Sequence, residues 1–276
     1  MTADLHTAFA ARYSDAPPVD DTMSNTDLLT SMAMRGSCRS FQDTPVPLAW
    51  VRMLCATALA SPTKSDLQQR DIVLLQSEQA RAALADLVGG QAWVAEAPMI
   101  AVFCGNNRRQ RLLHTWHDVP FSNDHLDAFF NAVGDAAVAL GAFVTAAEAT
   151  GLGCCPISAV RNEAAAVSDL LNLPDHVFPF AGLAFGFPKD RPRISKRLPL
   201  GVTCHIDRYE ETGLRTQVEA YDTDRAAAQP YRTQRLVDEF GHSDAYAWSQ
   251  DKVRQYSQPE RADFGAFARA KGFDLR

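Results

Sequence analysis

One apolar stretch, residues 131–162, constrains the fold of this chain more than any other feature of its sequence. Alanine, valine, leucine and phenylalanine fill its first half, and only Asp135 and Glu148 carry charge, so a helix here has little surface suited to water. The Gly-Leu-Gly sequence at 151–153 ends that helix. Residues 154–160 are apolar and too few for another helix, which predicts a buried strand that leads into a turn. We expect function at this turn.

Small residues dominate the expected helix and leave two interpretations open. They are Gly134, Ala136, Ala137, Ala139, Gly141, Ala142, Ala146 and Ala147. Small side chains let a second helix approach closely, as at a seam between subunits, but an alanine-rich helix inside a monomer has the same composition. The acidic residues in the run and its polar flanks argue against a membrane span.

Composition limits the class of protein and its partners. At 276 residues and 46% hydrophobic, the chain can bury a full core. A net charge of −6 without a Lys/Arg block gives no field that attracts nucleic acid or a membrane surface. The six cysteines form no CxxC pair, and residues 1–13 have neither a basic region nor a sustained apolar core, so we expect no secretory signal, free thiols and a cytoplasmic location.

The order of elements predicts a single α+β domain with additions at both ends. Residues 1–24 are rich in Ala, Asp and Pro and are expected to form an arm or a frayed terminus. Residues 25–212 form the expected core, and the polar residues 213–276 an extension that wraps over it. Strands are predicted at 72–75, 97–104, 177–187 and 201–205, and helices at 28–34, 48–60, 78–88, 164–171, 215–228, 248–256 and 261–271.

Three polar segments are candidates for ligand binding. The turn at 35–41 carries two arginines and two serines, which suit a phosphate monoester, although arginines also favour a solvated helix C-terminus. The loop at 61–69 and the basic loop at 189–197 could line a site or simply face water. His114 and His117 lie three apart but lack a third ligand at a convincing spacing, so no metal site is predicted.

Taken in order, these segments resemble those of the FMN-dependent nitroreductase superfamily, in its NADPH-preferring nitroreductase and flavin reductase branch. The resemblance runs over roughly residues 30–275 through the 35–41 turn, the SPTKSDLQQ loop, Gly-Gly-Gln91, the Gly-Leu-Gly stop, the turn at 156–162 and Arg-Leu-Pro199. It implies a nitroreductase-like mixed sheet flanked by helices, in an intertwined homodimer with FMN at each of two interface sites. The small-residue helix would then be a subunit seam.

The resemblance also implies flavin contacts at named positions. Arg35, Ser37 and Arg39 would hold the phosphate and ribityl end, where Arg35 and Gly36 replace the His and Arg of the family's HRSIR. The other implied contacts are Thr63, Ser65 and Gln68 from the partner subunit, Gln91 on the ring or ribityl chain, backbone groups of Ile157, Ser158 and Ala159 near N5, and Arg197 with the adjacent Lys196. The family has Gly-Gly where this chain has Ser158 and Ala159, whose Cβ atoms restrict the approach to the ring.

By the same resemblance, hydride would pass from NAD(P)H through the flavin to a nitroaromatic, quinone or flavin acceptor, with no catalytic side chain required. Arg232 and Arg235 are the candidates for binding the nicotinamide nucleotide, with Gln234 an alternative for the matching position. Two further hypotheses stay open. The protein could be a specialised flavin-dependent tailoring or dehalogenating enzyme, or a non-catalytic flavin-binding protein.

Overall fold

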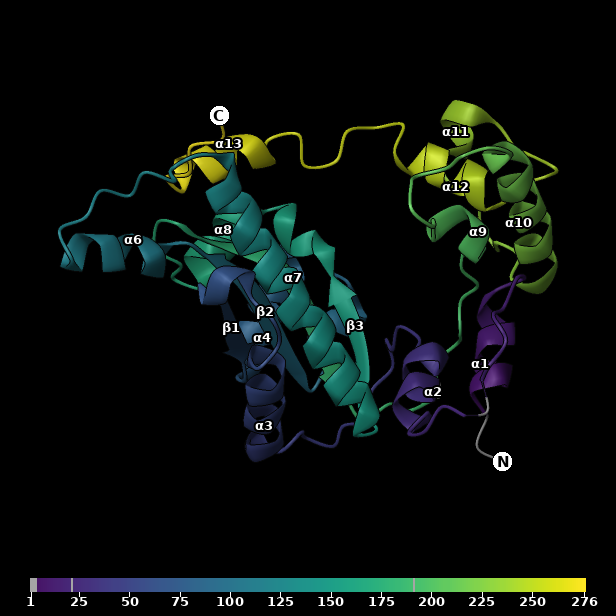
Figure 1. Cartoon of the computed structure of the whole chain (residues 1–276), viewed down its shortest axis with the longest axis horizontal. Helices are drawn as coiled ribbons and strands as arrows, with labels where there is room; N and C mark the ends of the chain where they lie inside the picture. Colours follow the sequence, from purple (N-terminus) through teal and green to yellow (C-terminus); the bar gives the residue numbers. More distant parts are fainter. Residues whose placement is uncertain (1–3, 21, 191) are drawn as a thin grey trace. The chain divides into compact units, whose positions relative to one another are not determined.

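The computed structural model describes residues 4–20, 22–190 and 192–276. The chain divides into two compact units, and each is described by itself (Figure 1). Residues 37–192 and 261–276 form what we call the sheet unit, and residues 1–36 and 193–260 form the helical unit. These boundaries differ from those expected at residues 24 and 212. The organisation into arm, core and extension stays a prediction.

The sheet unit is built on four strands in the order β1-β2-β4-β3. All neighbouring strands run antiparallel, with Val73 opposite Val102, Val102 opposite Gly182, and Cys155 opposite Ala184. The strands are β1 (Arg70–Leu75), β2 (Met99–Asn106), β3 (Gly153–Ile157) and β4 (Val177–Gly186). Helices of the sheet unit are α3 (Leu48–Leu59), α4 (Glu78–Leu87), α5 (Ala92–Ala95), α6 (Arg108–Trp116), α7 (Leu126–Ala149), α8 (Ala164–Leu170) and α13 (Phe264–Ala270), with 3-10 turns η1 (Lys64–Asp66) and η2 (Ser158–Arg161). The predicted α+β class is confirmed.

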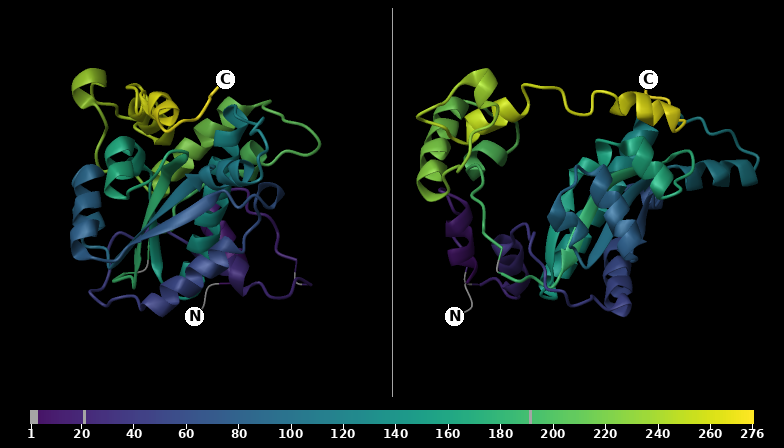
Figure 2. Two further views of the ribbon diagram at one scale, coloured as in Figure 1. Left: turned by 90° about the vertical axis from the view of Figure 1, so that its left-hand side faces the viewer. Right: turned by 180° about the vertical axis from the view of Figure 1, so that it is seen from behind.

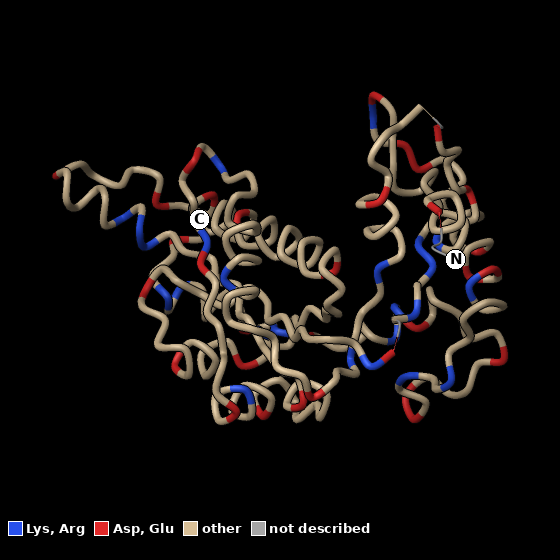
Figure 3. The backbone as a smooth tube through the Cα atoms, turned by 90° about the horizontal axis from the view of Figure 1, so that it is seen from below, with Lys and Arg blue, Asp and Glu red and all other residues tan. Residues whose placement is uncertain are grey.

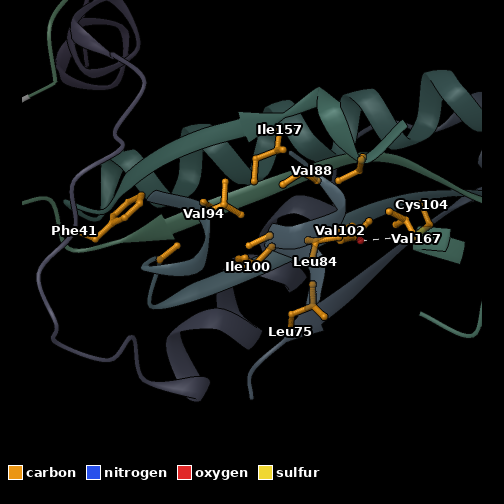
Figure 4. Close-up of a cluster of buried hydrophobic side chains, with 14 of the residues drawn as sticks. Phe41, Leu75, Leu84, Val88, Val94, Ile100, Val102, Cys104, Ile157 and Val167 are labelled. Atoms are coloured by element: carbon orange, nitrogen blue, oxygen red, sulfur yellow. Dashed lines mark hydrogen bonds between the residues drawn. The ribbon is translucent and has the colours of Figure 1, made fainter. Parts of the chain in front are cut away.

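The core lies on both faces of the sheet, because successive side chains of a strand point to opposite sides. On β2, Ile100 and Val102 pack with residues of α4 and α8 (Figure 4), whereas Ala101 and Phe103 pack with residues of α3 and α7. Figure 2 shows helices on either side of the strands. The hydrophobic runs that predicted β2 and β4 are therefore explained by burial on two faces.

The central helix of the prediction is α7, which spans 24 residues. Ala132, Ala136, Ala139 and Phe143 are fully buried along one side, and the Phe143 ring lies edge-on to Phe103 and Phe185 at centroid distances of 5.7 and 5.1 Å. By length and composition alone, α7 could cross a membrane. Its packing against the sheet identifies it as the core helix that the sequence predicts.

The helical unit contains α1 (Leu5–Arg12), α2 (Asp27–Met34), α9 (Leu200–Thr203), α10 (Leu214–Ala228), α11 (Val237–Phe240) and α12 (Trp248–Gln255). Residues 5–12, within the expected arm, form α1: Asp4 caps the helix, and Leu5 and Ala8 are buried in a cluster with Ala33 of α2. The buried Arg12 side chain donates to the backbone oxygens of Ala33, at 2.5 Å, and of Arg35. Arg12 thus ties α1 to the C-terminal end of α2.

The strand predicted at 201–205 is wrong. Residues 200–203 form α9, and both carboxylate oxygens of Asp15 accept hydrogen bonds from its first backbone N–H groups, Leu200 at 2.9 Å and Gly201 at 3.0 Å. A cap supplied from 185 residues away outweighs the β-propensity of Val202 and Thr203.

Candidate functional site

The segment 37–42, which overlaps the 35–41 turn that is expected to bind phosphate, is pinned to the ends of two strands. Cys38 N donates to Cys154 O of β3 at 3.0 Å, and Gln42 N donates to Phe187 O, just past β4, at 2.8 Å. Cys38 is buried, and burial raises the pKa of its thiol, so the thiol stays protonated. Ser37 and Arg39 alternate with it and are exposed. The backbone is fixed while the polar side chains stay available to a ligand.

Trp93 connects two of the predicted flavin contacts. The Arg39 guanidinium carbon lies 5.6 Å from the Trp93 ring centre, within cation–π range. Trp93 Nε1 donates to Gln91 Oε1 at 2.9 Å, and Gln91 Nε2 donates to Val88 O at 3.1 Å. The structure thus brings Arg39 and Gln91 together. Trp93 is not among the predicted residues, although an aromatic ring two positions after Gln91 was a readable signal.

The loop at 61–69 is held by Asp135 of α7, one of the two acids in the apolar run. Asp135 accepts a hydrogen bond from the Thr63 hydroxyl, and the backbone N–H of Gln68 donates to Thr63 Oγ1 at 2.8 Å. Ser65 and Gln68 have φ of 48° and 52°, in the left-handed region. Each such residue costs about 1 kcal/mol or more, so the surrounding contacts must stabilise the loop. Ser65 and Gln68 are exposed on it.

The turn at Ile157, Ser158 and Ala159 joins the end of β3 to η2. Ile157 is buried and Ser158 is exposed. The turn packs so closely on β4 that a Cβ added to Gly182 would lie 3.3 Å from Ile157 Cβ. Arg261 also reaches this turn, with Nη2 3.5 Å from Ser158 Oγ.

Arg261 is a site residue that the sequence did not single out. Its Nε donates to Asn162 Oδ1 at 2.7 Å, just past the Ser158 turn. Arg261 was expected inside a helix over 261–271, but α13 begins only at Phe264, and Arg261 has φ of 56°. The guanidinium is therefore carried by the chain that enters α13. Contact between residues about 100 positions apart leaves no local pattern in a sequence.

Three predicted phosphate and flavin contacts lie in the helical unit. Arg35 ends α2, and its backbone oxygen accepts from Arg12. Lys196 forms an ion pair with Asp224 of α10, and Arg197 Nη1 donates to Ser195 Oγ at 2.6 Å. Lys196 and Arg197 line a cavity of about 370 Å³ together with Tyr13, Ser195, Leu198, Thr203, Tyr221, Arg225 and Trp248. The ion pair with Asp224 ties Lys196 to α10.

The nicotinamide candidates take different roles in the helical unit. The Gln234 amide closes the loop from 234 to 243, with Nε2 donating to Ser243 O at 2.7 Å and Oε1 accepting from Ser243 N at 2.9 Å. Arg235 Nε lies 3.1 Å from Oδ1 of the buried Asp251. Arg232 is exposed. Arg235 is exposed too, but its guanidinium is paired with Asp251.

The carboxylate of Asp251 organises this part of the helical unit. Its Oδ1 accepts from the Tyr246 hydroxyl at 2.9 Å, and its Oδ2 lies 2.8 Å from Lys252 Nζ. Burial acts to raise the pKa of Asp251, but the hydrogen bonds from Lys252 and Tyr246 and the charges of Lys252 and Arg235 lower it overall. Acidic and basic residues are interspersed along the chain here (Figure 3).

The predicted residues thus fall into two sets. Ser37, Arg39, Thr63, Ser65, Gln68, Gln91, Ile157, Ser158 and Ala159 belong to the sheet unit, and Arg35, Lys196, Arg197, Arg232 and Arg235 to the helical unit. Within the residues that the structure describes, no three His, Cys, Asp or Glu side chains gather as metal ligands. Within each unit, exposed guanidinium, amide and hydroxyl groups on fixed segments offer hydrogen-bond donors of the kind that an anionic ligand needs.

Comparison with known proteins identifies the class. Residues 32–187 match the model of the nitroreductase family, and residues 195–276 match the C-terminal domain of that family. The first match alone covers more than half of the chain. The chain therefore belongs to the nitroreductase family.

Individual relatives agree with this assignment. An "FMN reductase [NAD(P)H]" of Bacillus subtilis is 31% identical over 75% of this chain and 84% of its own length. An "oxygen-insensitive NADPH nitroreductase" of Salmonella typhimurium is 35% identical over 63% of this chain and 71% of its own. The structure of an NADPH:FMN oxidoreductase from Vibrio harveyi complexed with NAD+ superposes with a TM-score of 0.79 at 25% identity, covering 90% of this chain and 99% of that one.

Proposed function

We propose that this protein is an FMN-dependent oxidoreductase that transfers hydride from NAD(P)H to a nitroaromatic, quinone or flavin acceptor. Membership of the nitroreductase family carries the proposal, since its relatives are named as FMN reductases and an NADPH nitroreductase. The fixed Arg39, Trp93 and Gln91 group supports it. When bound, FMN supplies the hydride-transfer chemistry, and the protein binds and orients the reactants.

The residues present fit FMN by their chemistry. A phosphate needs cationic and hydroxyl donors, which Ser37 and Arg39 offer from a pinned backbone, and the Gln91 amide can both donate to and accept from a flavin edge. Ser61 Oγ, at the start of the 61–69 loop, is buried without a hydrogen-bond partner among the described residues. A bound ligand would satisfy such a group.

Nine further residues complete the proposed flavin site. Arg35 and Arg197 would add positive charge for the phosphate. Thr63, Ser65 and Gln68 would reach the flavin of the partner subunit. Backbone groups of Ile157, Ser158 and Ala159 would face N5, with Lys196 adding positive charge near the reduced ring.

We propose a homodimer in which α7 lies at the subunit seam. Phe130, 67% exposed, and Val138 are apolar residues on the side of α7 that faces away from the sheet. A Cβ added at Gly134 or Gly141 would meet no atom within 4 Å, so this side of the helix is open for a close neighbour. An exposed apolar helix face of this kind is typical of an interaction surface.

For the nicotinamide nucleotide we propose Arg232 as a contact to a phosphate group, because it is exposed two residues before the loop that Gln234 closes. Arg235 would hold the base of that loop through Asp251. The acceptor would be a small molecule. Six free cysteines and the net negative charge support a cytoplasmic location.

The visible spectrum of the purified protein, before and after NADPH, tests the proposal. We expect a yellow protein with flavin absorbance that bleaches on addition of NADPH and recovers with an acceptor. A colourless protein that takes up no added FMN would refute the proposed function. Flavin that is bound but never reduced by NADPH or NADH would support a non-catalytic flavin-binding protein instead.

One observation favours a second candidate, a specialised flavin-dependent tailoring or dehalogenating enzyme. At the turn where family resemblance leads us to expect Gly-Gly, this chain presents Ser158 with Arg261 beside it. A hydroxyl and a guanidinium at this place would select a polar or anionic acceptor. Efficient turnover of neutral nitroaromatics would count against this second candidate. The first candidate, the FMN-dependent oxidoreductase, predicts such turnover.

A further inference from the structure

The buried carboxylate of Asp135 gathers the hydrogen bonds of the 61–69 loop. The residue is 4% exposed on α7. Lys64 N donates to its Oδ1 at 2.9 Å, and Gln69 N donates to its Oδ2 at 2.8 Å, where the Thr63 hydroxyl also binds. Three donors from both arms of the loop therefore converge on one side chain that lies 66 to 72 residues away in sequence.

Arg70 completes this network from the other side. Its Nη1 lies 3.7 Å from Asp135 Oδ2, and both side chains are almost fully buried. Its Nη2 donates to Leu59 O at 2.7 Å and Ser61 O at 3.0 Å, which fixes the chain where α3 ends and the loop begins. The charge attraction to Asp135 and the two hydrogen bonds of Nη2 thus tie Arg70 to both the helix and the loop.

We propose that Asp135 and Arg70 are positioning residues that fix the 61–69 loop in its flavin-binding conformation. The loop carries three residues in the left-handed region, Ser65, Asp66 and Gln68, which free peptides seldom adopt together. The converging hydrogen bonds at Thr63, Lys64 and Gln69 hold these residues from either end. The inference rests on the proposed function where it concerns flavin, because Ser65 and Gln68 are proposed flavin contacts.

Hydrogen exchange of the flavin-free protein tests the anchor itself. In Asp135→Asn, the amide cannot accept from three donors as the carboxylate does, and we expect backbone exchange in residues 63–69 to become about tenfold faster or more. Asp86→Asn makes the same chemical change on the exposed face of α4 and should leave this segment unchanged. Unaltered exchange at 63–69 in Asp135→Asn would overturn the proposal.

Flavin affinity then tests the consequence through a double-mutant cycle with Thr63→Val. Each single substitution should raise the FMN dissociation constant about tenfold, as measured by quenching of flavin fluorescence. Because the hydrogen bond between Thr63 and Asp135 is lost in both single variants, the double variant should bind FMN more tightly than the roughly hundredfold loss that independent effects would give. The proposal would be overturned if the effects of the two substitutions on the free energy of FMN binding were purely additive, which is what a general loss of stability would produce. Unchanged affinity in Thr63→Val would overturn it as well.

The two measurements keep the failures distinct. If the wild-type protein binds no FMN, the proposed function fails, while the exchange comparison still decides whether Asp135 holds the loop. If the wild type binds FMN and the variants bind it equally well, the proposed function stands and the positioning role is refuted. Should Asp135→Asn not fold, Thr63→Val replaces only the hydroxyl and still decides the matter by its own hydrogen exchange in the flavin-free protein, where no flavin contact is at stake.

Discussion

At the scale of single residues, the candidate site depends on side chains that fix their neighbours. Gly153 is an example, because a Cβ there would lie 2.6 Å from the Cys38 Sγ that packs beneath the Ser37 and Arg39 segment. Gly153→Ala should therefore lower the free energy of unfolding by about 1–3 kcal/mol. Urea denaturation measures this. Gly265→Ala, where the new Cβ meets only the end of the Arg269 side chain at 3.7 Å, should be neutral or slightly stabilising, and an equal loss in both would refute the steric explanation.

Arg39 should not tolerate lysine. Its guanidinium carbon lies 5.6 Å from the centre of the Trp93 ring, and a lysine ammonium would keep the charge but lose the planar group and its forked donors. We expect Arg39→Lys to weaken FMN binding about tenfold, or about 1.4 kcal/mol, with the melting temperature of the flavin-free protein unchanged. Arg269→Lys on the exposed surface of α13 is the control. Affinity equal to the wild type in Arg39→Lys would show that charge alone suffices.

The limits of sequence analysis are also clearest at single residues. Arg39 and Gln91 could be singled out as candidates because they stand in recognisable local motifs. Asp135 could be seen only as a break in an apolar run, since the groups that it binds are 66 to 72 residues away. Arg261 was hidden for the same reason. Long-range hydrogen bonds depend on how helices and strands pack, and a single sequence does not record that packing.

At the scale of elements, the strands β1, β2 and β4 and the helix α7 could be predicted because each has a hydrophobic pattern long enough to identify its period. The segment at 200–203 could not, because its four residues carry no period and its conformation is decided by Asp15. The helix at 5–12 has a weak amphipathic pattern, because its buried apolar residues are Leu5 and Ala8 alone. Its position depends on their packing against Ala33 of α2, which the sequence does not reveal. The conformation of such short elements depends on the residues from other parts of the chain that contact them.

The network around Asp251 predicts an acid-sensitive helical unit. The pKa of Asp251 in the folded protein lies below its ordinary value of 3.8. The ionised carboxylate therefore contributes its full stability above about pH 3.8, and this stability is lost as the pH falls through the pKa of the folded state. Circular dichroism at decreasing pH should show α10 and α12 losing stability in this acid range. In Asp251→Asn that portion of the pH dependence should disappear, and stability at neutral pH should fall because Arg235 and Lys252 lose their partner. An unchanged acid transition in the variant would contradict this account.

At the scale of the whole molecule, the face of α7 turned away from the sheet predicts the oligomeric state. Ala137 lies on that exposed face, so Ala137→Asp would place a charge in the proposed seam and should convert the dimer to a monomer, as measured by light scattering with size-exclusion chromatography. Ala82→Asp makes the same change on the exposed side of α4, on the opposite face of the sheet, and should leave the dimer intact. A wild-type monomer, or a dimer unaffected by Ala137→Asp, would refute the proposed seam.

The hydrogen bonds between Asp135 and the 61–69 loop have a consequence for how the two subunits of a dimer would contribute to each flavin site. If the loop contacts the flavin of the partner subunit, Asp135→Asn would weaken flavin binding in the partner's site and not in the site of the subunit that carries the substitution. A mixed dimer of one Asp135→Asn subunit and one subunit with an intact loop but Arg39→Lys would then concentrate both defects in a single site. The other site would be wholly normal, and half of the flavin would bind with full affinity.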